Sequence, residues 1–256
     1  MQTIRQTGWM VVRQGRNLMR EPIWIAMMII QPLLWLLLYG QLFSKVTPLH
    51  AGASSYIEFL TPGIICMNAF FGGSWSGMAM ISDLDRHVID RFLAAPASRL
   101  AIILSQVVRA GVTAIIQAII LLTIGYLLGV RVHGGVLGVL VVFAAAFLLA
   151  SVFAGFSHGI ALLLRRESSM IATANFVSLP LMFLSSILIG AALMPGWIRQ
   201  VSRFNPVNWG VQAARNAVVF DGPWGQTAVY LLLLLAATAA TSAFATWSFR
   251  AYQRSI

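Results

Sequence analysis

Charged residues are scarce in this sequence. Only 9% of the 256 residues are Asp, Glu, Lys or Arg, whereas 59% are hydrophobic. A soluble domain usually carries roughly a quarter charged residues, so this chain lacks the polar side chains that would cover a globule in water. Its apolar residues form long blocks, which is typical of membrane-spanning helices. The sequence therefore predicts an all-α polytopic membrane protein.

Motifs for nucleotide, metal and disulfide chemistry are missing as well. The one lysine, Lys45, has no GxxxxGK[ST] pattern around it that could cradle phosphate groups. The sequence contains no HExxH or CxxC, and the single cysteine, Cys66, excludes an internal disulfide bond. We therefore expect no catalytic residues, no metal and no cofactor in this chain. The N-terminus lacks an apolar segment with a small-residue cleavage site, so we expect no removable signal peptide.

The basic residues are scattered. The formal net charge is +10, but the arginines occur one to four at a time between apolar blocks. A nucleic-acid surface would gather them into one patch with aromatic partners. Arginines at the borders of apolar segments are typical of the membrane interface. We expect membrane lipids, and no nucleic acid, to surround them.

Six apolar segments can cross a bilayer, which requires about 20 residues of helix. The expected spans are about 22–43, 59–82, 100–130, 136–164, 170–193 and 228–249. Eleven basic residues flank these spans on the side of the two termini and five flank them on the other side. The richer side is expected to be cytoplasmic. We predict a single transmembrane domain over residues 1–256, multi-pass in the cytoplasmic (inner) membrane, with both termini in the cytoplasm.

Shorter elements are expected outside the spans. Residues 1–20 place four arginines on one arc of a helix, namely Arg5, Arg13, Arg16 and Arg20. This pattern predicts an amphipathic interfacial helix, with a frayed tail as the alternative. Between spans five and six, residues 195–203 and 207–220 are too short to cross the membrane. We expect them to be short re-entrant helices that dip into the outer leaflet.

Two enzymatic alternatives are weak. Ser74, Ser76 and His158 could suggest a membrane hydrolase, but Trp75 stands where GxSxG requires serine. Gly73 and Gly77 form GxxxG instead, which favours close helix packing. Three aspartates could suggest a metal-dependent lipid transferase; they are Asp83, Asp85 and Asp90. Basic neighbours partly neutralise them, and no second acidic cluster exists.

The aspartates lie in residues 83–93, which are better interpreted as a short amphipathic helix. Ile89, Phe92 and Leu93 would form its apolar side, suited to docking in a partner's groove. A solvated loop is the alternative. Arg109, near the start of span three, is the one charge that could lie within a span. It could be functional or could extend its guanidinium to the lipid headgroups, and both interpretations stay open.

Three stretches together resemble a known family. They are Phe59-Leu60-Thr61-Pro62-Gly63; Asp90-Arg91-Phe92 with Pro96-Ala97-Ser98-Arg99; and Pro180, Pro195-Gly196-Trp197-Ile198, Phe204-Asn205-Pro206-Val207 and Ala213-Ala214-Arg215. In order and spacing they resemble the ABC-2 type membrane subunits of ATP-binding-cassette exporters, especially permeases similar to that of the daunorubicin-resistance system. The chain has His87-Val88-Ile89 where the family often has glycine, and this difference concerns the subfamily and the cargo.

The resemblance implies partners and sites. Two permease subunits, expected to be a homodimer, would pair with two cytosolic ATPase subunits that bind ATP and Mg²⁺. The ATPase-coupling residues would be Asp83, Asp85, Arg86, Asp90, Arg91 and Phe92. The outer-gate residues would be Pro195, Trp197, Asn205, Pro206 and Arg215. Aromatic residues and one cation are candidates for the substrate path: Phe70, Phe71, Trp75, Arg109 and Phe176.

The function expected from the resemblance is export of an amphiphilic drug or lipid-like substrate. The ATPases would supply the energy, because this chain offers no nucleotide chemistry of its own. Two alternatives stay open, namely export of a lipid-linked saccharide or polysaccharide and an integral membrane enzyme that modifies lipids. The direction of transport is implied by the resemblance alone.

Overall fold

The structure is a computed structural model that describes residues 22–46, 52–86, 99–219 and 223–253. Every regular element within these ranges is a helix, which confirms the all-α class. The expected interfacial helix at residues 1–20 lies outside the described residues. So do three of the expected coupling residues, Asp90, Arg91 and Phe92.

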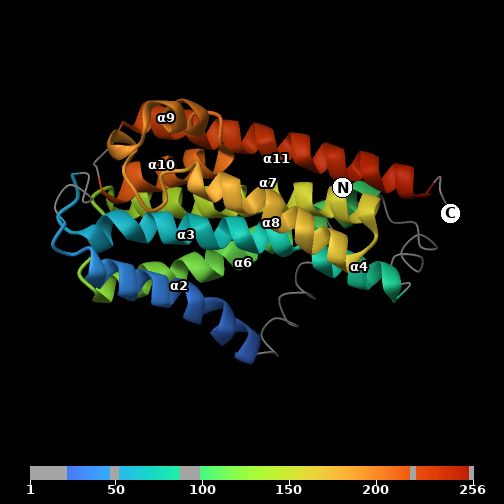
Figure 1. Ribbon diagram of the computed structural model, residues 1–256, viewed down its shortest axis with the longest axis horizontal. Helices are drawn as coiled ribbons and strands as arrows, with labels where there is room; N and C mark the ends of the chain where they lie inside the picture. Colours follow the sequence, from blue (N-terminus) through green and yellow to red (C-terminus); the bar gives the residue numbers. More distant parts are fainter. Residues whose placement is uncertain (1–21, 47–51, 87–98, 220–222, 254–256) are drawn as a thin grey trace.

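The helices form an elongated bundle (Figure 1). They are α2 (Pro22–Leu42), α3 (Tyr56–Trp75), α4 (Gly77–Asp85), α6 (Arg99–Leu127), α7 (Gly135–Leu164), α8 (Glu167–Phe183), η2 (Ala191–Leu193), α9 (Gly196–Ser202), α10 (Pro206–Val218) and α11 (Trp224–Gln253). Successive long helices alternate in direction, so α9 and α10 lie at one end of the bundle and α4 at the other. We call these the α10 end and the α4 end.

Four helical segments in the described ranges are long and apolar enough to cross a membrane. They are Tyr56–Asp85, Leu100–Leu127, Gly135–Leu164 and Trp224–Tyr252. The part of α2 from Ile30 to Leu42 is apolar but shorter, and α8 has 17 residues. The chain is therefore membrane-embedded. Four of the six expected spans correspond to these full-length segments, and the count of six stays a prediction.

The fifth expected span ends early. Helix α8 ends at Phe183, ten residues before the expected boundary at residue 193. Pro180 lies in its last turn and has no backbone N–H to donate to the carbonyl of Phe176. At the end of the helix the side-chain amide of Asn205 donates to Leu181 O at 2.7 Å and to Leu184 O at 3.0 Å, carbonyls that have no donor from a further helical turn. The chain beyond α8 turns and reaches the short helices α9 and α10, whose existence the sequence predicted.

The second expected span continues into α4. Met80 and Ile81 of α4 are buried in the bundle, so the helix runs on past residue 82. Asp83 and Asp85 therefore belong to the end of this segment, and the expected separate helix does not begin with them. Asp83 and Asp85 lie at the α4 end because the apolar residues that precede them continue the span.

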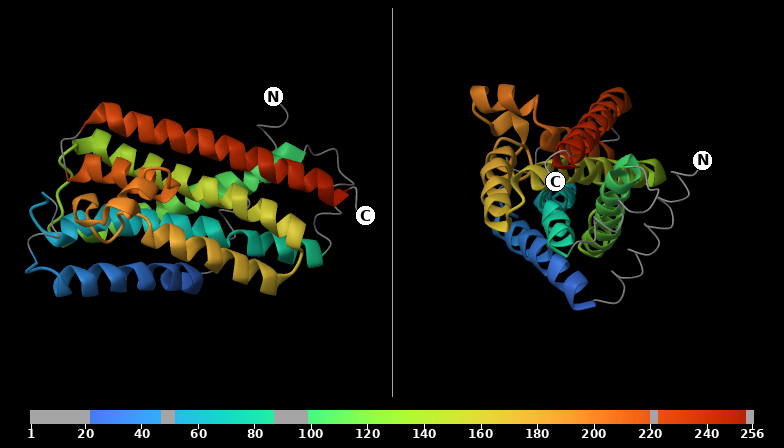
Figure 2. Two further views of the ribbon diagram at one scale, coloured as in Figure 1. Left: turned by 45° about the horizontal axis from the view of Figure 1, so that its top comes forward. Right: turned by 90° about the vertical axis from the view of Figure 1, so that its right-hand side faces the viewer.

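Helix α7 packs against α3, α6, α10 and α11. In the end-on view (Figure 2, right) α3 lies near the middle of the bundle, with α2, α6 and α8 around it. The contacts of α7 rely on glycine. A side chain on Gly73 of α3 would collide with the backbone carbonyl of Ala150, and one on Gly77 would lie 2.6 Å from Ser157 O. Gly155 and Gly159 of α7 face side chains of α11: a Cβ on Gly155 would lie 2.7 Å from Thr241 Oγ1, and one on Gly159 would collide with the Phe244 ring. The predicted packing role of Gly73 and Gly77 is confirmed.

Candidate functional site

A buried arginine organises the α10 end. Arg215 on α10 is 3% exposed. Its guanidinium donates from Nη2 to Ile187 O at 3.2 Å and from Nε to Phe59 O at 3.4 Å. Nη1 lies 3.4 Å from Ser186 Oγ, and the group sits 3.8 Å from the ring centroid of Phe59. Within the described part of the chain, the guanidinium of Arg215 is thus held by two carbonyl oxygens, one hydroxyl and one aromatic ring.

These contacts explain why Arg215 can be buried. A charge taken out of water must be compensated by hydrogen bonds or by an aromatic face. Gly63 makes the approach possible, because a Cβ there would lie 2.5 Å from Ile187 O and 3.3 Å from Nη2 of Arg215. The stretch 59–63 and the arginine of α10, far apart in sequence, therefore form one site.

Asn205 connects two helix ends with one side chain. Its Oδ1 accepts from Val207 N at 2.9 Å and caps the start of α10, as expected of asparagine at this position. Its Nδ2 binds the last carbonyls of α8, as described above. Pro206 occupies the first turn of α10, where no backbone donor is required. The arrangement fixes the angle between α8 and α10.

A polar network extends this site. Asn208 Oδ1 accepts from the backbone N–H of Ser186 at 3.2 Å and from its hydroxyl at 2.7 Å, and Gln212 Nε2 donates to Ser186 Oγ at 2.9 Å. Asn208, Gln212 and Arg215 thus bind the segment that follows α8. Their spacing of i, i+4 and i+7 places them on one face of α10. That spacing was the sequence signal that could have identified Asn208 and Gln212, which we did not predict.

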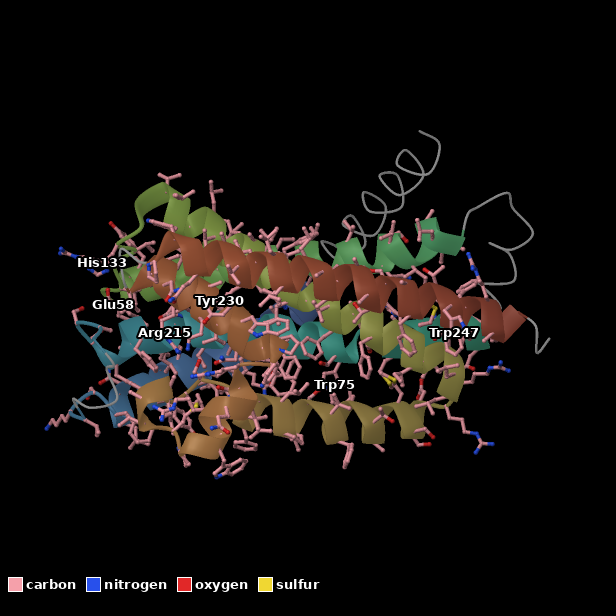
Figure 3. All side chains as sticks on the ribbon, turned by 90° about the horizontal axis from the view of Figure 1, so that it is seen from above. Glu58, Trp75, His133, Arg215, Tyr230 and Trp247 are labelled. Carbon is pink, nitrogen blue, oxygen red and sulfur yellow. The ribbon has the colours of Figure 1, made fainter. Side chains whose placement is uncertain are left out.

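A second polar cluster at this end was also unexpected. Glu58 of α3 is 1% exposed, and its Oε1 lies 3.4 Å from Nδ1 of His133 in the α6–α7 loop. Its Oε2 accepts from the backbone N–H of Ser54 at 2.8 Å and from the Ser54 hydroxyl. Figure 3 places Glu58, His133 and Arg215 toward the same end of the bundle. A lone acidic residue at the start of a long apolar segment was the available signal.

The remaining residues of the expected outer gate lie apart from Arg215. Trp197 is 64% exposed, and Pro195 is exposed at the start of α9. The structure therefore brings Asn205, Pro206 and Arg215 together around the end of α8. It leaves Trp197 and Pro195 on the outer surface of the same end.

The α4 end carries the described part of the expected coupling surface. Asp85 and Arg86 are exposed and Asp83 is half-buried. Arg109 of α6 is also half-buried and lies within electrostatic range of Asp83. Asp85 and Arg86 are thus accessible to a partner at the α4 end.

The residues of the enzymatic alternatives do not form a catalytic pair or a metal cluster in the described part of the chain. Both ring nitrogens of the buried His158 lack a hydrogen-bond partner, and Ser76 Oγ donates to Gly73 O at 2.6 Å. No serine is therefore hydrogen-bonded to this imidazole. No group of three or more metal-binding side chains occurs among these residues either.

The aromatic candidates for the substrate path do not share one surface. Phe70 is fully buried and packs edge-on against Phe153, with the ring centroids 4.4 Å apart. Phe71 is half-buried beside it. Trp75 is 37% exposed and Phe176 is 80% exposed; Figure 3 places Trp75 near the middle of the bundle. Phe70 has no free surface in this conformation, and the path stays a prediction.

Comparison with known proteins agrees with these features. The profile of a family described as ABC-2 type transporter matches residues 5–219. A chain named transport permease ycf38 from Cyanophora paradoxa is 34% identical over 215 residues, covering 83% of this chain and 73% of the relative. Its counterpart from Pyropia yezoensis is 29% identical with the same coverage. The daunorubicin resistance ABC transporter permease protein DrrB1 of Streptomyces coeruleorubidus is 25% identical over 236 residues, 91% of this chain and 80% of the relative.

Proposed function

This chain belongs to the ABC-2 type transporter family, and from that membership we propose that it is the membrane-spanning permease subunit of an ATP-binding-cassette exporter. The observation that carries the proposal is the match over residues 5–219 on a bundle with four full-length apolar segments. In the proposed assembly two copies of the chain pair with two cytosolic ATPase subunits, which bind ATP and Mg²⁺.

The proposed orientation places the α4 end in the cytoplasm. Exposed Asp85 and Arg86 lie at this end, as do Arg165 and Arg166 at the turn between α7 and α8. A concentration of basic residues on one side favours the cytoplasm for that side. Helices α2 and α8 would complete six crossings, with both termini inside and the membrane being the cytoplasmic one. Residues 83–98 would then face the ATPase.

The α10 end would be the outer gate. Arg215 and Asn205 hold α10, the end of α8 and the start of α3 together through at least one hydrogen bond to each. In the proposed gate, these hydrogen bonds hold the end of α8 and the start of α3 against α10, and the three elements together would form a structured barrier. ATP-driven movement at the opposite end would bias the dimer between states in which this barrier is closed or open.

The proposed cargo is an amphiphilic drug or lipid-like molecule. The support is the 25% identity with a daunorubicin resistance permease; Phe176 and Trp75, which are exposed on separate parts of the bundle, are candidate contacts. Arg109 is the candidate contact for a polar or anionic part of the cargo, because it is a cation inside a long apolar segment.

Co-purification with an ATPase tests the assembly. The chain is co-expressed with an ATPase encoded beside it and purified through a tag on the permease. The double charge reversal Asp85→Arg with Arg86→Asp is expected to lower ATPase recovery, whereas Arg199→Glu, an exposed arginine at the α10 end, is expected to leave it unchanged. Equal recovery for all three proteins would place the ATPase contact elsewhere.

Transport is tested in inverted membrane vesicles that contain both subunits. ATP-dependent uptake of a fluorescent amphiphile is expected, and omission of ATP or of the permease should abolish it. Uptake of a lipid-linked saccharide in place of the amphiphile would overturn the cargo proposal. Turnover of a lipid by the purified permease without an ATPase, lost on replacing His158 or Ser74, would overturn the transport proposal.

A further inference from the structure

The hydrogen-bond ladder of the α3–α4 segment is interrupted at Ser76. In a continuous helix, the Gly77 N–H would bind the Gly73 carbonyl. Here the Gly73 carbonyl accepts from the backbone N–H of Ser76 at 3.1 Å and from its hydroxyl at 2.6 Å. The backbone at Ser76 stays right-handed, with φ −62° and ψ −23°. The interruption is therefore an exchange of hydrogen bonds within backbone that stays right-handed.

A serine of α7 forms hydrogen bonds with backbone groups on both sides of this interruption. The Gly77 N–H donates to Ser157 Oγ at 2.9 Å, and the Ser157 hydroxyl donates to Ser74 O at 2.6 Å. Ser157 is 1% exposed. Its hydroxyl acts as donor and acceptor at once and binds two of the backbone groups that the interruption frees, the Gly77 N–H and the Ser74 carbonyl. A side chain inserted into the ladder is a recognised cause of a bend in a long helix.

A small, partly open pocket of about 10 Å³ lies between α3, α7 and α8, with Ser74, Ser157 and Ser178 among the residues that line it. The hydroxyl oxygens of Ser74 and Ser178 are buried without a hydrogen-bond partner in the structure. The pocket holds about one water molecule at most, and it places these two hydroxyls beside Ser157.

The same residues permit a second arrangement. Gly77 N–H could bind Gly73 O, and the next N–H along, from Met78, could bind Ser74 O, which restores the continuous ladder. The Ser157 hydroxyl would then bind the carbonyl four residues earlier in its own helix, as serine commonly does. In each arrangement the Gly77 N–H and the Ser157 hydroxyl both have hydrogen-bond partners. An element with two discrete hydrogen-bonded arrangements is the kind that can switch.

We propose that Ser157 is a positioning residue of the transport cycle. Its hydroxyl sets the angle between α3 and α4. When the hydroxyl exchanges between the two arrangements, this angle changes, and movement of the ATPase-facing segment is transmitted to the helices of the bundle. This role rests on the proposed function, because α4 leads directly into residues 87–98, where the ATPase would press. Gly77 keeps α4 against α7 throughout, since a Cβ there would lie 2.6 Å from both Ser157 O and Ser157 Oγ.

The variants are chosen to isolate this hydroxyl. Ser157→Ala removes it, and Ser157→Cys keeps a weaker donor and acceptor. Ser151→Ala is the matched control, because Ser151 lies on the same helix, is fully buried and has a hydroxyl without a partner. Spin labels are placed on Ser82→Cys in α4 and Ser168→Cys in α8. The native Cys66 is 0% exposed and is expected to escape labelling.

The readout is the distance between the two labels in the permease–ATPase complex in nanodiscs, without nucleotide and after trapping with ATP and vanadate. The wild type and Ser151→Ala are expected to show a nucleotide-dependent shift of the distance distribution. Ser157→Ala is expected to lose that shift and Ser157→Cys to retain part of it, while ATP hydrolysis continues. Loss of hydrolysis-linked transport should accompany loss of the shift.

Each other outcome has a definite meaning. A shift in Ser157→Ala equal to that in Ser151→Ala would contradict the role of Ser157. If Ser157→Ala does not fold, an unchanged shift in Ser157→Cys would contradict it equally. Nucleotide trapping that leaves the wild-type distance unchanged, in a complex that hydrolyses ATP, would also exclude it. If no ATPase binds the permease at all, the proposed function itself is wrong, and this result is distinct from a failure of the role proposed for Ser157.

Discussion

The carboxylate of Glu58 and the imidazole of His133 lie 3.4 Å apart, Oε1 to Nδ1, and join the start of α3 to the α6–α7 loop. Nδ1 of His133 also lies 3.0 Å from the carbonyl oxygen of Val218, at the end of α10. Because Nδ1 faces a carbonyl oxygen, we assign the Nδ1–H tautomer to His133. The backbone N–H groups of His133 and Gly134 bind the carbonyls of Val218 and Ala217, each at 3.1 Å. The start of α3, the α6–α7 loop and the end of α10 are thereby joined at His133.

The first prediction concerns this contact. Glu58→Ala removes the acceptor for both donors of Ser54 and the anion that faces His133, and is expected to cost about 1–3 kcal/mol of stability. His133→Ala should cost less, because the backbone bonds of the loop to α10 remain. Thermal unfolding of the purified protein in detergent gives both values. The double variant should fall short of the sum by up to about 1 kcal/mol. Strict additivity would mean that the two side chains do not interact.

Arg215 provides the second prediction. Arg215→Met keeps much of the apolar volume but leaves the carbonyls of Phe59 and Ile187 without this donor. Loss of the hydrogen bonds is partly offset by relief of the cost of burying the charge, so the expected destabilisation is about 1–3 kcal/mol. Arg199→Met, at an exposed position of α9, should stay within about 0.5 kcal/mol of wild type. The comparison is made by thermal unfolding. Equal stability of the two variants would show that the guanidinium contacts contribute nothing.

The third prediction separates the two functions of Asn205. Asn205→Ala removes the helix cap and two amide hydrogen bonds, and should cost about 1–3 kcal/mol. Asn205→Asp keeps the capping oxygen but places a buried carboxylate against the carbonyls of Leu181 and Leu184. We expect the aspartate variant to be the less stable of the two, although aspartate caps isolated helices as well as asparagine does. Wild-type stability of Asn205→Asp in unfolding measurements would show that capping alone matters.

The fourth prediction uses two adjacent glycines of α3. A Cβ on Gly73 would collide with the Ala150 carbonyl and lie 3.1 Å from Phe153 Cβ, whereas a Cβ on Gly72 would meet nothing within 4 Å. Gly73→Ala should therefore cost about 1–3 kcal/mol, while Gly72→Ala should leave stability unchanged or slightly raised because alanine favours helix. Expression level and thermal unfolding compare them. A neutral Gly73→Ala would indicate that α3 can move away from α7.

Much of the bundle follows from the sequence because a lipid-exposed backbone must bond to itself, and a helix is the element that does so within one segment. The expected span at residues 136–164 differs from α7 by one residue, since both ends of this apolar segment carry clear signals. Gly134 and Gly135 lie at its start, and Arg165, in the left-handed conformation with φ 55°, ends it.

The end of α8 could not be predicted in this way. Residues 184–193 are apolar enough to continue a span, and the helix ends where Asn205, more than 20 residues later in the sequence, takes its carbonyls. Likewise, Arg215 was expected at the outer gate by resemblance, but its partners Phe59 and Ile187 come from distant segments. Ser157 gave no signal, because nothing in the sequence distinguishes a serine inserted into a neighbouring helix from one that merely packs.

The glycines of α7 and its neighbours have a consequence for how such a protein can vary. Toward α3 and α4, the nearest neighbours of Gly73 and Gly77 are backbone atoms of Ala150 and Ser157. This separation cannot be adjusted by trimming or enlarging a side chain. Toward α11, Gly155 and Gly159 face the side chains of Thr241 and Phe244, so the spacing of helices around α7 is expected to vary on the α11 side and to stay constant on the α3 and α4 side.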